Sequence, residues 1–151
     1  MHTTFTHSWK ILNIIFSLSS VLDGNFPVRR LREPLTLTVT NLKDTRSTIL
    51  VGVFRKDDPF TKKSFKNYLL NPEGTSAPTL FIEGLPYGEY AIALFQDRNG
   101  DEKLNTNLFG IPKEPYGFSN NIRPTLSAPG YQECRFTYSE NNNKLIIKII
   151  R

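Results

Sequence analysis

The sequence predicts an all-β fold, a single antiparallel β-sandwich of about seven strands. Its 151 residues suit one domain. Phenylalanine and tyrosine, which favour strands, occur 11 and 6 times. Several short apolar runs are separated by glycine, proline and asparagine turn signals, and no alternating strand–helix units are visible. That arrangement is typical of a sandwich built from short strands.

Four strands are predicted in the first two thirds of the chain. Leu35–Thr40 alternates strictly between aliphatic residues and threonine, as expected of a half-buried strand. Thr48–Phe54 is apolar on both faces, which predicts a central strand. Thr79–Ile82 and Tyr90–Phe95 are the third and fourth strands.

A turn connects the third and fourth strands. Its sequence, Leu85-Pro86-Tyr87-Gly88, places proline second and glycine fourth, which suits a type I turn. The Leu-Pro-x-Gly-x-Tyr pattern ending at Tyr90 recurs at the corners of immunoglobulin-like sandwiches, where the tyrosine hydroxyl bonds to nearby backbone. We therefore expect Tyr90 to lock a corner of the fold.

Two strands end the chain, Gln132–Tyr138 and Lys144–Ile150, joined by a hairpin loop at Glu140–Asn143. Alternation places Cys134, the single cysteine, on the same face as two later aromatic residues. A small buried apolar residue is favoured over a catalytic thiol, because free cysteines are among the most buried residue types.

The long connection between the second and third strands contains a helix-like pattern. Phe65, Tyr68 and Leu69 have the spacing of one helix face, which predicts a short helix over Thr61–Leu70. Its apolar side either seals one end of the sandwich or binds a ligand, and sealing is favoured.

The N-terminal residues read differently from the rest. Lys10 precedes an apolar run, Ile11–Leu22, that is too short to span a bilayer, which needs about 20 residues. The run fits the apolar region of a secretory signal peptide, with a buried strand or short helix as the alternative. We expect a signal peptide at 1–24, a linker at 25–34 and the sandwich at 35–151. The protein is then exported (periplasmic, cell-surface or secreted) and not membrane-spanning.

The net charge of +5 raises the question of an anionic partner. The basic residues are scattered in two groups, one near Arg30 and one near Lys63. No nucleic-acid-binding motif accompanies them, so we expect no nucleic-acid partner. A solvated basic face is favoured over a functional anionic partner.

The segment after the fourth strand has the ligand spacing of an EF-hand-type calcium loop. The candidate Ca²⁺ ligands are Asp97, Asn99, Asp101, Lys103 through its backbone carbonyl, and Asn105. Glu102 replaces the usual glycine of the sharp turn, and Leu108 replaces the final bidentate glutamate. The alternative is a loop of Asx turns, in which the same side chains bond their own backbone amides. That structural alternative is favoured, and no cofactor other than Ca²⁺ is indicated.

The following residues combine prolines, glycines, aromatic rings and amides. Such a surface suits a glycan or peptide ligand, and it also suits a long loop packed by its own side chains. The predicted ligand or partner surface consists of Tyr116, Phe118, Ser119, Asn120 and Asn121.

The run D-x-N-G-D-x-K-L-N-T-N-L-F-G-I-P-K-E-P-Y-G-F-S-N-N, preceded by L-P-Y-G-E-Y-A-I-A-L-F-Q-D and L-T-V-T-N-L, resembles the uncharacterised exported family catalogued as domain of unknown function 2141. The resemblance covers roughly residues 35–150. It implies a prealbumin-like or transthyretin-like β-sandwich, usually behind a bacterial signal peptide, with no known enzyme activity. Gln96 stands where the family often has histidine, and Asn105 where it often has aspartate. Both departures remove a candidate metal ligand or proton carrier.

An enzyme is disfavoured because both histidines, His2 and His7, lie in the predicted signal peptide. We expect a non-catalytic exported sandwich that binds a glycan, a peptide or an envelope protein through the loop at 96–121. The alternative is a purely structural envelope protein that assembles through an edge strand. A hydrolase using Asp97 and Asp101 comes third.

Overall fold

A computed structural model of the chain describes residues 32–125 and 127–151. The predicted signal peptide, and the linker as far as residue 31, lie outside the described residues. Within the described ranges, no helix is long and apolar enough to cross a membrane.

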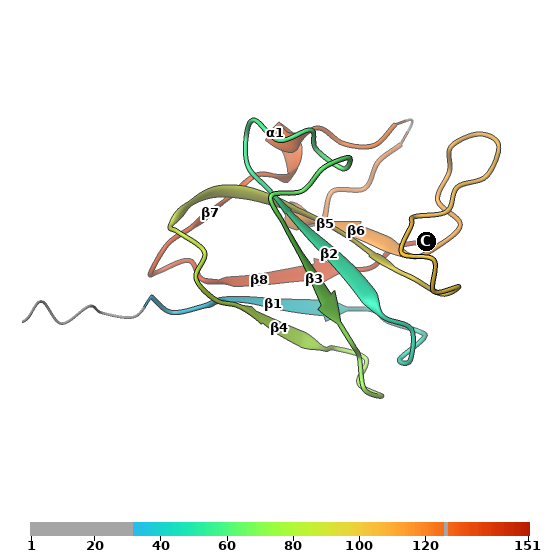
Figure 1. Cartoon of the computed structure of the whole chain (residues 1–151), viewed down its shortest axis with the longest axis horizontal. Coiled ribbons are helices and arrows are strands. Elements are labelled where there is room, and N and C mark those ends of the chain that lie inside the picture. The colour runs from blue at the N-terminus through green and yellow to red at the C-terminus, as the bar shows by residue number, and fades with distance from the viewer. Residues whose placement is uncertain (1–31, 126) are drawn as a thin grey trace, which may run out of the picture. The chain divides into compact units, whose positions relative to one another are not determined.

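The described part of the chain forms eight strands in two sheets that pack face to face (Figure 1). The smaller sheet has the order β4-β1-β8, with β1 at Leu35–Thr40, β4 at Thr79–Ile82 and β8 at Lys144–Lys148. The larger sheet has the order β3-β2-β5-β6, with β2 at Ile49–Phe54, β3 at Lys66–Leu70, β5 at Gly88–Gln96 and β6 at Tyr116–Phe118. β7, at Phe136–Tyr138, pairs with the beginning of β5.

The core lies between the two sheets and follows the alternation of the strands. In β1 every second residue is buried, and β2 and β5 present their own alternate residues to the same space. Burial of this apolar surface is the main stabilising contribution to the sandwich. The central residues are Leu37, Val39, Ile49, Val51, Val53, Ile82, Ile92 and Ile147.

The sheets are joined on one side and separate on the other. The backbone groups of Tyr116 and Ile150 exchange hydrogen bonds of 2.9 and 2.8 Å, which links β6 to the chain just after β8. On the opposite side, β3 pairs only with β2, and β4 pairs only with β1, among the described residues. These two strands are the free edges of the sandwich.

Several sequence predictions are confirmed. The strands predicted at Leu35–Thr40 and Thr79–Ile82 have those bounds, and the strand near Thr48–Phe54 is central, between β3 and β5. The Tyr90 hydroxyl donates to the Pro86 carbonyl at 3.0 Å, so the predicted tyrosine corner is present.

The predicted antiparallel sandwich has one exception, because β1 and β8 run parallel. The predicted short helix over Thr61–Leu70 is wrong. The N–H groups of Lys62 and Lys63 donate to the Pro59 carbonyl at 2.9 and 3.0 Å in a turn, and β3 begins at Lys66. Alternate residues of β3 face inward, so the helix-like spacing came from residues on opposite faces of a strand.

The strand predicted at Gln132–Tyr138 is wrong in its first half. The structure places a short helix, α1, at Tyr131–Cys134, and only the last three residues form β7. The side chain of Glu133 accepts the Gly130 N–H at 2.8 Å, which closes the first turn of α1. The assignment to an immunoglobulin-like or prealbumin-like subclass stays a prediction.

Candidate functional site

The outer face of the larger sheet is apolar, whereas outward-facing strand residues of a sandwich are normally polar. Because successive residues of a strand alternate between faces, the residues opposite the core point outward. They are mainly aliphatic and aromatic: Leu50 and Phe54 of β2, Leu69 of β3, Ala93 and Phe95 of β5, and Tyr116 and Phe118 of β6.

One end of this face is covered by a second, smaller core. Phe54 and Phe118 are buried there with Cys134 of α1. The ring of Phe60 packs edge-on against that of Phe54, with the centroids 5.0 Å apart. Burial raises the pKa of the Cys134 thiol to about 12, so the thiol stays protonated at neutral pH. The predicted burial of Cys134 is confirmed, but its placement on one strand face with Phe136 and Tyr138 is wrong, because Cys134 belongs to α1 and to the smaller core.

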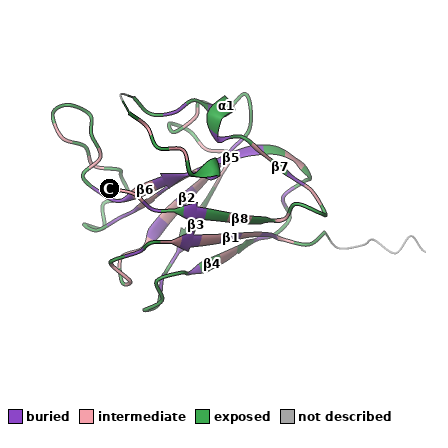
Figure 2. Ribbon diagram, turned by 180° about the vertical axis from the view of Figure 1, so that it is seen from behind, coloured by how far each residue is buried: buried purple, intermediate pink, exposed green. Residues whose placement is uncertain are grey.

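The rest of the face is open and forms a groove of about 1170 Å³. Its floor contains Leu50, Gly52 and Phe95, and its walls are the 61–64 turn, the 102–112 loop and residues 124–128 apart from 126. A Cβ atom on Gly52 would lie 2.9 Å from the Phe54 ring, so glycine keeps the floor clear beside that ring. Figure 2 shows the contrast between the buried stretches of β5 and β6 and the largely exposed loop beyond them.

The rim of the groove is both apolar and basic. Leu69, Phe109 and Ile111 are large hydrophobic residues that are exposed and line the groove. The charged lining residues are Lys62, Lys63, Lys103 and a single acid, Glu102. The groove therefore has a net positive rim around an apolar floor.

The first half of the 97–121 loop is held by hydrogen bonds from its own backbone. The carboxylate of Asp97 accepts the N–H groups of Gly100 at 2.7 Å and of Glu102 at 2.9 Å. Asp101 accepts the Lys103 N–H at 2.9 Å and a side-chain amide hydrogen of Asn105 at 2.9 Å. These bonds, led by that from Asn105, lower the pKa of Asp101.

The predicted calcium ligands are thus close together but already bonded. The side-chain amide of Asn99 donates to Asp101 at 3.0 Å and to Asn105 at 2.8 Å. The described residues contain no group of three or more His, Cys, Asp or Glu side chains arranged to hold a metal ion. These contacts favour the Asx-turn interpretation, and Ca²⁺ binding stays a prediction.

Glu114 fixes both ends of this part of the loop. It is buried, and its two oxygens accept the N–H groups of Arg98 at 2.9 Å and of Asn105 at 3.0 Å. The side chain of Asn107 then organises the tip by accepting the N–H groups of Phe109 at 2.9 Å and of Ile111 at 3.0 Å. These bonds hold the wall that carries the exposed rim residues.

The predicted ligand surface at 116–121 divides into two parts. Tyr116 and Phe118 line the groove. Ser119 is instead fully buried, where its hydroxyl accepts the Ile92 N–H at 2.9 Å and donates to the Cys134 carbonyl.

The two asparagines after Ser119 also hold backbone groups of neighbouring segments. Asn120 donates to the carbonyls of Glu133 at 3.0 Å and Arg135 at 2.8 Å. Asn121 donates to the Ile146 carbonyl at 3.1 Å and accepts the Lys148 N–H at 2.7 Å. These amides fasten the chain after β6 to α1 and β8, and neither residue lines the groove.

Sequence reasoning missed Leu50 and Phe95 as groove residues, whereas Leu69 belonged to the apolar pattern for which ligand binding was the less favoured alternative. A signal was present, because the Thr48–Phe54 segment is apolar on both faces. This two-faced apolar pattern predicted a central strand. It also indicated that the outer face of the sheet is apolar and needs to be covered.

The family model described as "Uncharacterized protein conserved in bacteria (DUF2141)" matches residues 37–146. The chain belongs to this family. The matched range runs from β1 into β8 and includes the whole loop after β5. Every lining residue of the groove of this DUF2141 protein therefore lies within the matched range. No curated protein and no solved structure matches the chain.

Proposed function

We propose that this DUF2141 protein is a non-catalytic, exported binding module that holds an extended apolar peptide segment of a partner protein in the groove. The observation that carries the proposal is the apolar outer face of the sheet, where Leu50, Phe95 and Tyr116 line the groove and Leu69 lies at its rim. Contiguous exposed apolar surface with a polar rim typically marks an interaction site.

The dimensions and charge of the groove support a peptide as the occupant. Its volume of about 1170 Å³ is above the range of roughly 300–1,000 Å³ typical of small-molecule pockets. Its lining extends over all four strands of the sheet's main path, as an extended chain requires. Lys62, Lys63 and Lys103 complement acidic residues on either side of the apolar segment.

A peptide array that includes apolar segments with acidic flanks tests this proposal, with a glycan array beside it. The double variant Phe109→Ser with Ile111→Ser removes rim residues that are 87% and 59% exposed. The matched control, Phe81→Ser with Ile146→Ser, removes residues that are 60% and 59% exposed on the smaller sheet. We expect the first pair to abolish peptide binding and the control to retain it. Equal loss in both pairs, or binding of glycans alone, contradicts the proposal.

A non-catalytic role is supported by the state of the reactive side chains. The Cys134 thiol is buried, and the carboxylates of Asp97 and Glu114 are engaged by backbone N–H groups. Hydrolysis of any member of an ester and glycoside panel, lost on Asp97→Asn, would revive the hydrolase alternative.

Export rests on the apolar run at 11–22, and intact-mass analysis from the native host tests whether that run is removed.

An assembly role in the cell envelope is the second candidate function. The free edges of β3 and β4 favour it, because unpaired strand edges can pair with another chain. Phe81 of β4 is also largely exposed. Concentration-dependent oligomers that disappear on Phe81→Ser, without peptide binding by the groove, would favour assembly over the peptide-binding proposal.

Calcium ordering of the 97–105 loop stays a prediction, although the hydrogen bonds of Asp97 and Asp101 argue against it. We expect the thermal midpoint to be the same in millimolar Ca²⁺ and in chelator. A midpoint that rises with Ca²⁺ and falls back with chelator would establish a site.

A further inference from the structure

A second cleft lies at the end of the sandwich where β5 finishes and the chain leaves β8. Its volume is about 270 Å³, and it shares no lining residue with the groove. Its polar and charged lining residues are Asn41, Lys43, Gln96, Arg98, Arg123 and Arg151.

The charged side chains of this cleft are all of one sign. Lys43, Arg98, Arg123 and Arg151 come from four separate segments, and no acid lines the cleft. None of the four side chains forms an ion pair with another residue in the described part of the chain. Cations gathered in this way repel one another and attract a counter-anion.

The carboxylate that interacts with Arg98, that of Asp44, is already engaged by other groups. Asp44 interacts electrostatically with Arg98, but one of its oxygens accepts the Arg46 N–H at 2.9 Å and the other accepts the Ser47 hydroxyl. Asp44 does not line the cleft.

Gln96 adds an unsatisfied acceptor to the same cleft. The residue is 1% exposed, and its Nε2 donates to the carbonyls of Asp44 at 2.6 Å and Ser47 at 3.3 Å. Its Oε1 is buried and has no hydrogen-bond partner among the described residues. A buried acceptor without a partner is destabilising, and a ligand that brings a hydrogen-bond donor would satisfy it.

We propose that this cleft binds a phosphate group that comes with a hydroxyl donor, as in inorganic hydrogen phosphate or glycerol phosphate. Guanidinium and ammonium groups form charge-assisted hydrogen bonds with phosphate oxygens, and arginine can do so with two N–H groups at once. The hydroxyl donates to Gln96 Oε1. The proposed site is independent of peptide binding in the groove.

Calorimetric titration of the full chain at neutral pH and constant ionic strength tests the proposal. The probes are inorganic phosphate, glycerol phosphate and sulfate, which carries no hydroxyl at this pH. We expect saturable binding of at least one phosphate probe and weaker binding of sulfate. The ¹⁵N-edited NMR signals of the Gln96 side-chain amide should shift on phosphate addition.

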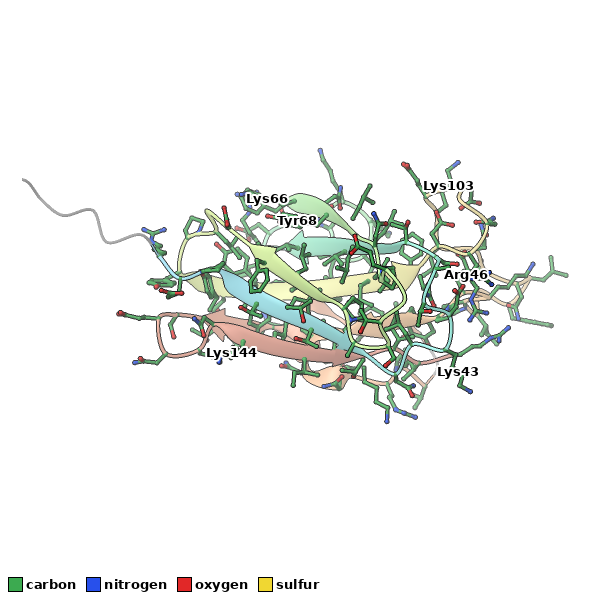
Figure 3. All side chains as sticks on the ribbon, turned by 90° about the horizontal axis from the view of Figure 1, so that it is seen from below. Lys43, Arg46, Lys66, Tyr68, Lys103 and Lys144 are labelled. Carbon is green, nitrogen blue, oxygen red and sulfur yellow. The ribbon has the colours of Figure 1, made fainter. Side chains whose placement is uncertain are left out.

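Two charge-matched pairs of substitutions locate the site. Arg98→Gln with Arg123→Gln should raise the Kd for phosphate about tenfold or more, because two charge-assisted contacts are lost. Lys66→Gln with Lys144→Gln removes the same charge toward the opposite end of the molecule from Lys43 (Figure 3). This control should change Kd by no more than about twofold, because salt screens distant charges.

Several outcomes distinguish the source of the phosphate or overturn the proposal. Preference for inorganic phosphate supports a free anion as ligand, and preference for glycerol phosphate supports an esterified one. Absence of saturable phosphate binding overturns the site, as does an equal loss in the two pairs of variants. Sulfate binding as tight as phosphate binding overturns the role of Gln96. If the double arginine variant fails to fold, the single exposed substitution Arg123→Gln is compared with Lys144→Gln alone, which removes the same charge.

Discussion

Glu114 is the residue on which the loop wall of the groove depends most directly. Glu114→Gln keeps the size of the side chain but replaces one oxygen with an NH₂ group. One of the N–H groups of Arg98 and Asn105 then faces a donor, and the other loses a charged acceptor. A hydrogen bond to a charged group contributes about 1.5–3 kcal/mol. Because Glu114 is buried, we expect the free energy of unfolding to fall by about 2–3 kcal/mol.

Thermal denaturation followed by circular dichroism measures this loss. At roughly 4 °C per kcal/mol for a domain of this size, the midpoint should fall by about 8–12 °C. Hydrogen exchange should also accelerate at the Arg98 and Asn105 amides. Glu102→Gln is the matched control, because it removes the same charge from an exposed position in the same loop. A midpoint and exchange rates equal to those of the control would refute the role of Glu114.

Three other substitutions or titrations follow from buried groups. Ser119→Ala leaves the Ile92 N–H and the Cys134 carbonyl without the hydroxyl, and should lower the free energy of unfolding in urea by about 2–4 kcal/mol. Tyr90→Phe removes the hydrogen bond to Pro86 and should cost about 1 kcal/mol in the same measurement. An unchanged urea midpoint in either variant contradicts the assignment. The Cys134 thiol, with its pKa raised from 9.0 to about 12, should resist alkylation at pH 8 until the protein unfolds. Because the unfolded thiol ionises first, the contribution of Cys134 to the free energy of unfolding should decline as pH rises from about 9 towards 12. The same pH dependence in Cys134→Ser over that window would count against this assignment.

The strands that were predicted correctly are those in which one face packs on the core. In β1 the alternation of Leu35, Leu37 and Val39 with threonine directly reflects burial on one side. The tyrosine corner was also predictable, because the contact from Tyr90 to Pro86 is local in sequence. Local sequence patterns therefore predicted most of the architecture.

The errors lie where distant segments override local spacing. β3 is a strand because it pairs with β2 from Ile49 to Val53, and no pattern within 61–70 reveals that partner. Likewise, α1 exists where its Tyr131 and Cys134 cover the outer face beside Phe54. The parallel pairing of β1 with β8 joins the two ends of the domain and has no local signature.

The candidate site was predictable only where its residues lie close together in the sequence. Tyr116 and Phe118 were predicted from their own loop, and both line the groove. Leu50, Leu69 and Phe95 come together only because β3, β2 and β5 are adjacent in the sheet. The polar residues Ser119, Asn120 and Asn121 are the kinds of side chain that bind ligands on a surface. Here they fasten backbone segments that are distant in sequence.

Methyl NMR mapping with an apolar, acid-flanked peptide tests the central claim most directly. Leu50 and Leu69 report on the groove, whereas Leu80 and Ile146 report on the smaller sheet. Peptide binding in the groove predicts chemical-shift changes at Leu50 and Leu69 that saturate with peptide, while Leu80 and Ile146 stay unchanged. Saturating changes confined to Leu80 and Ile146 would contradict the claim.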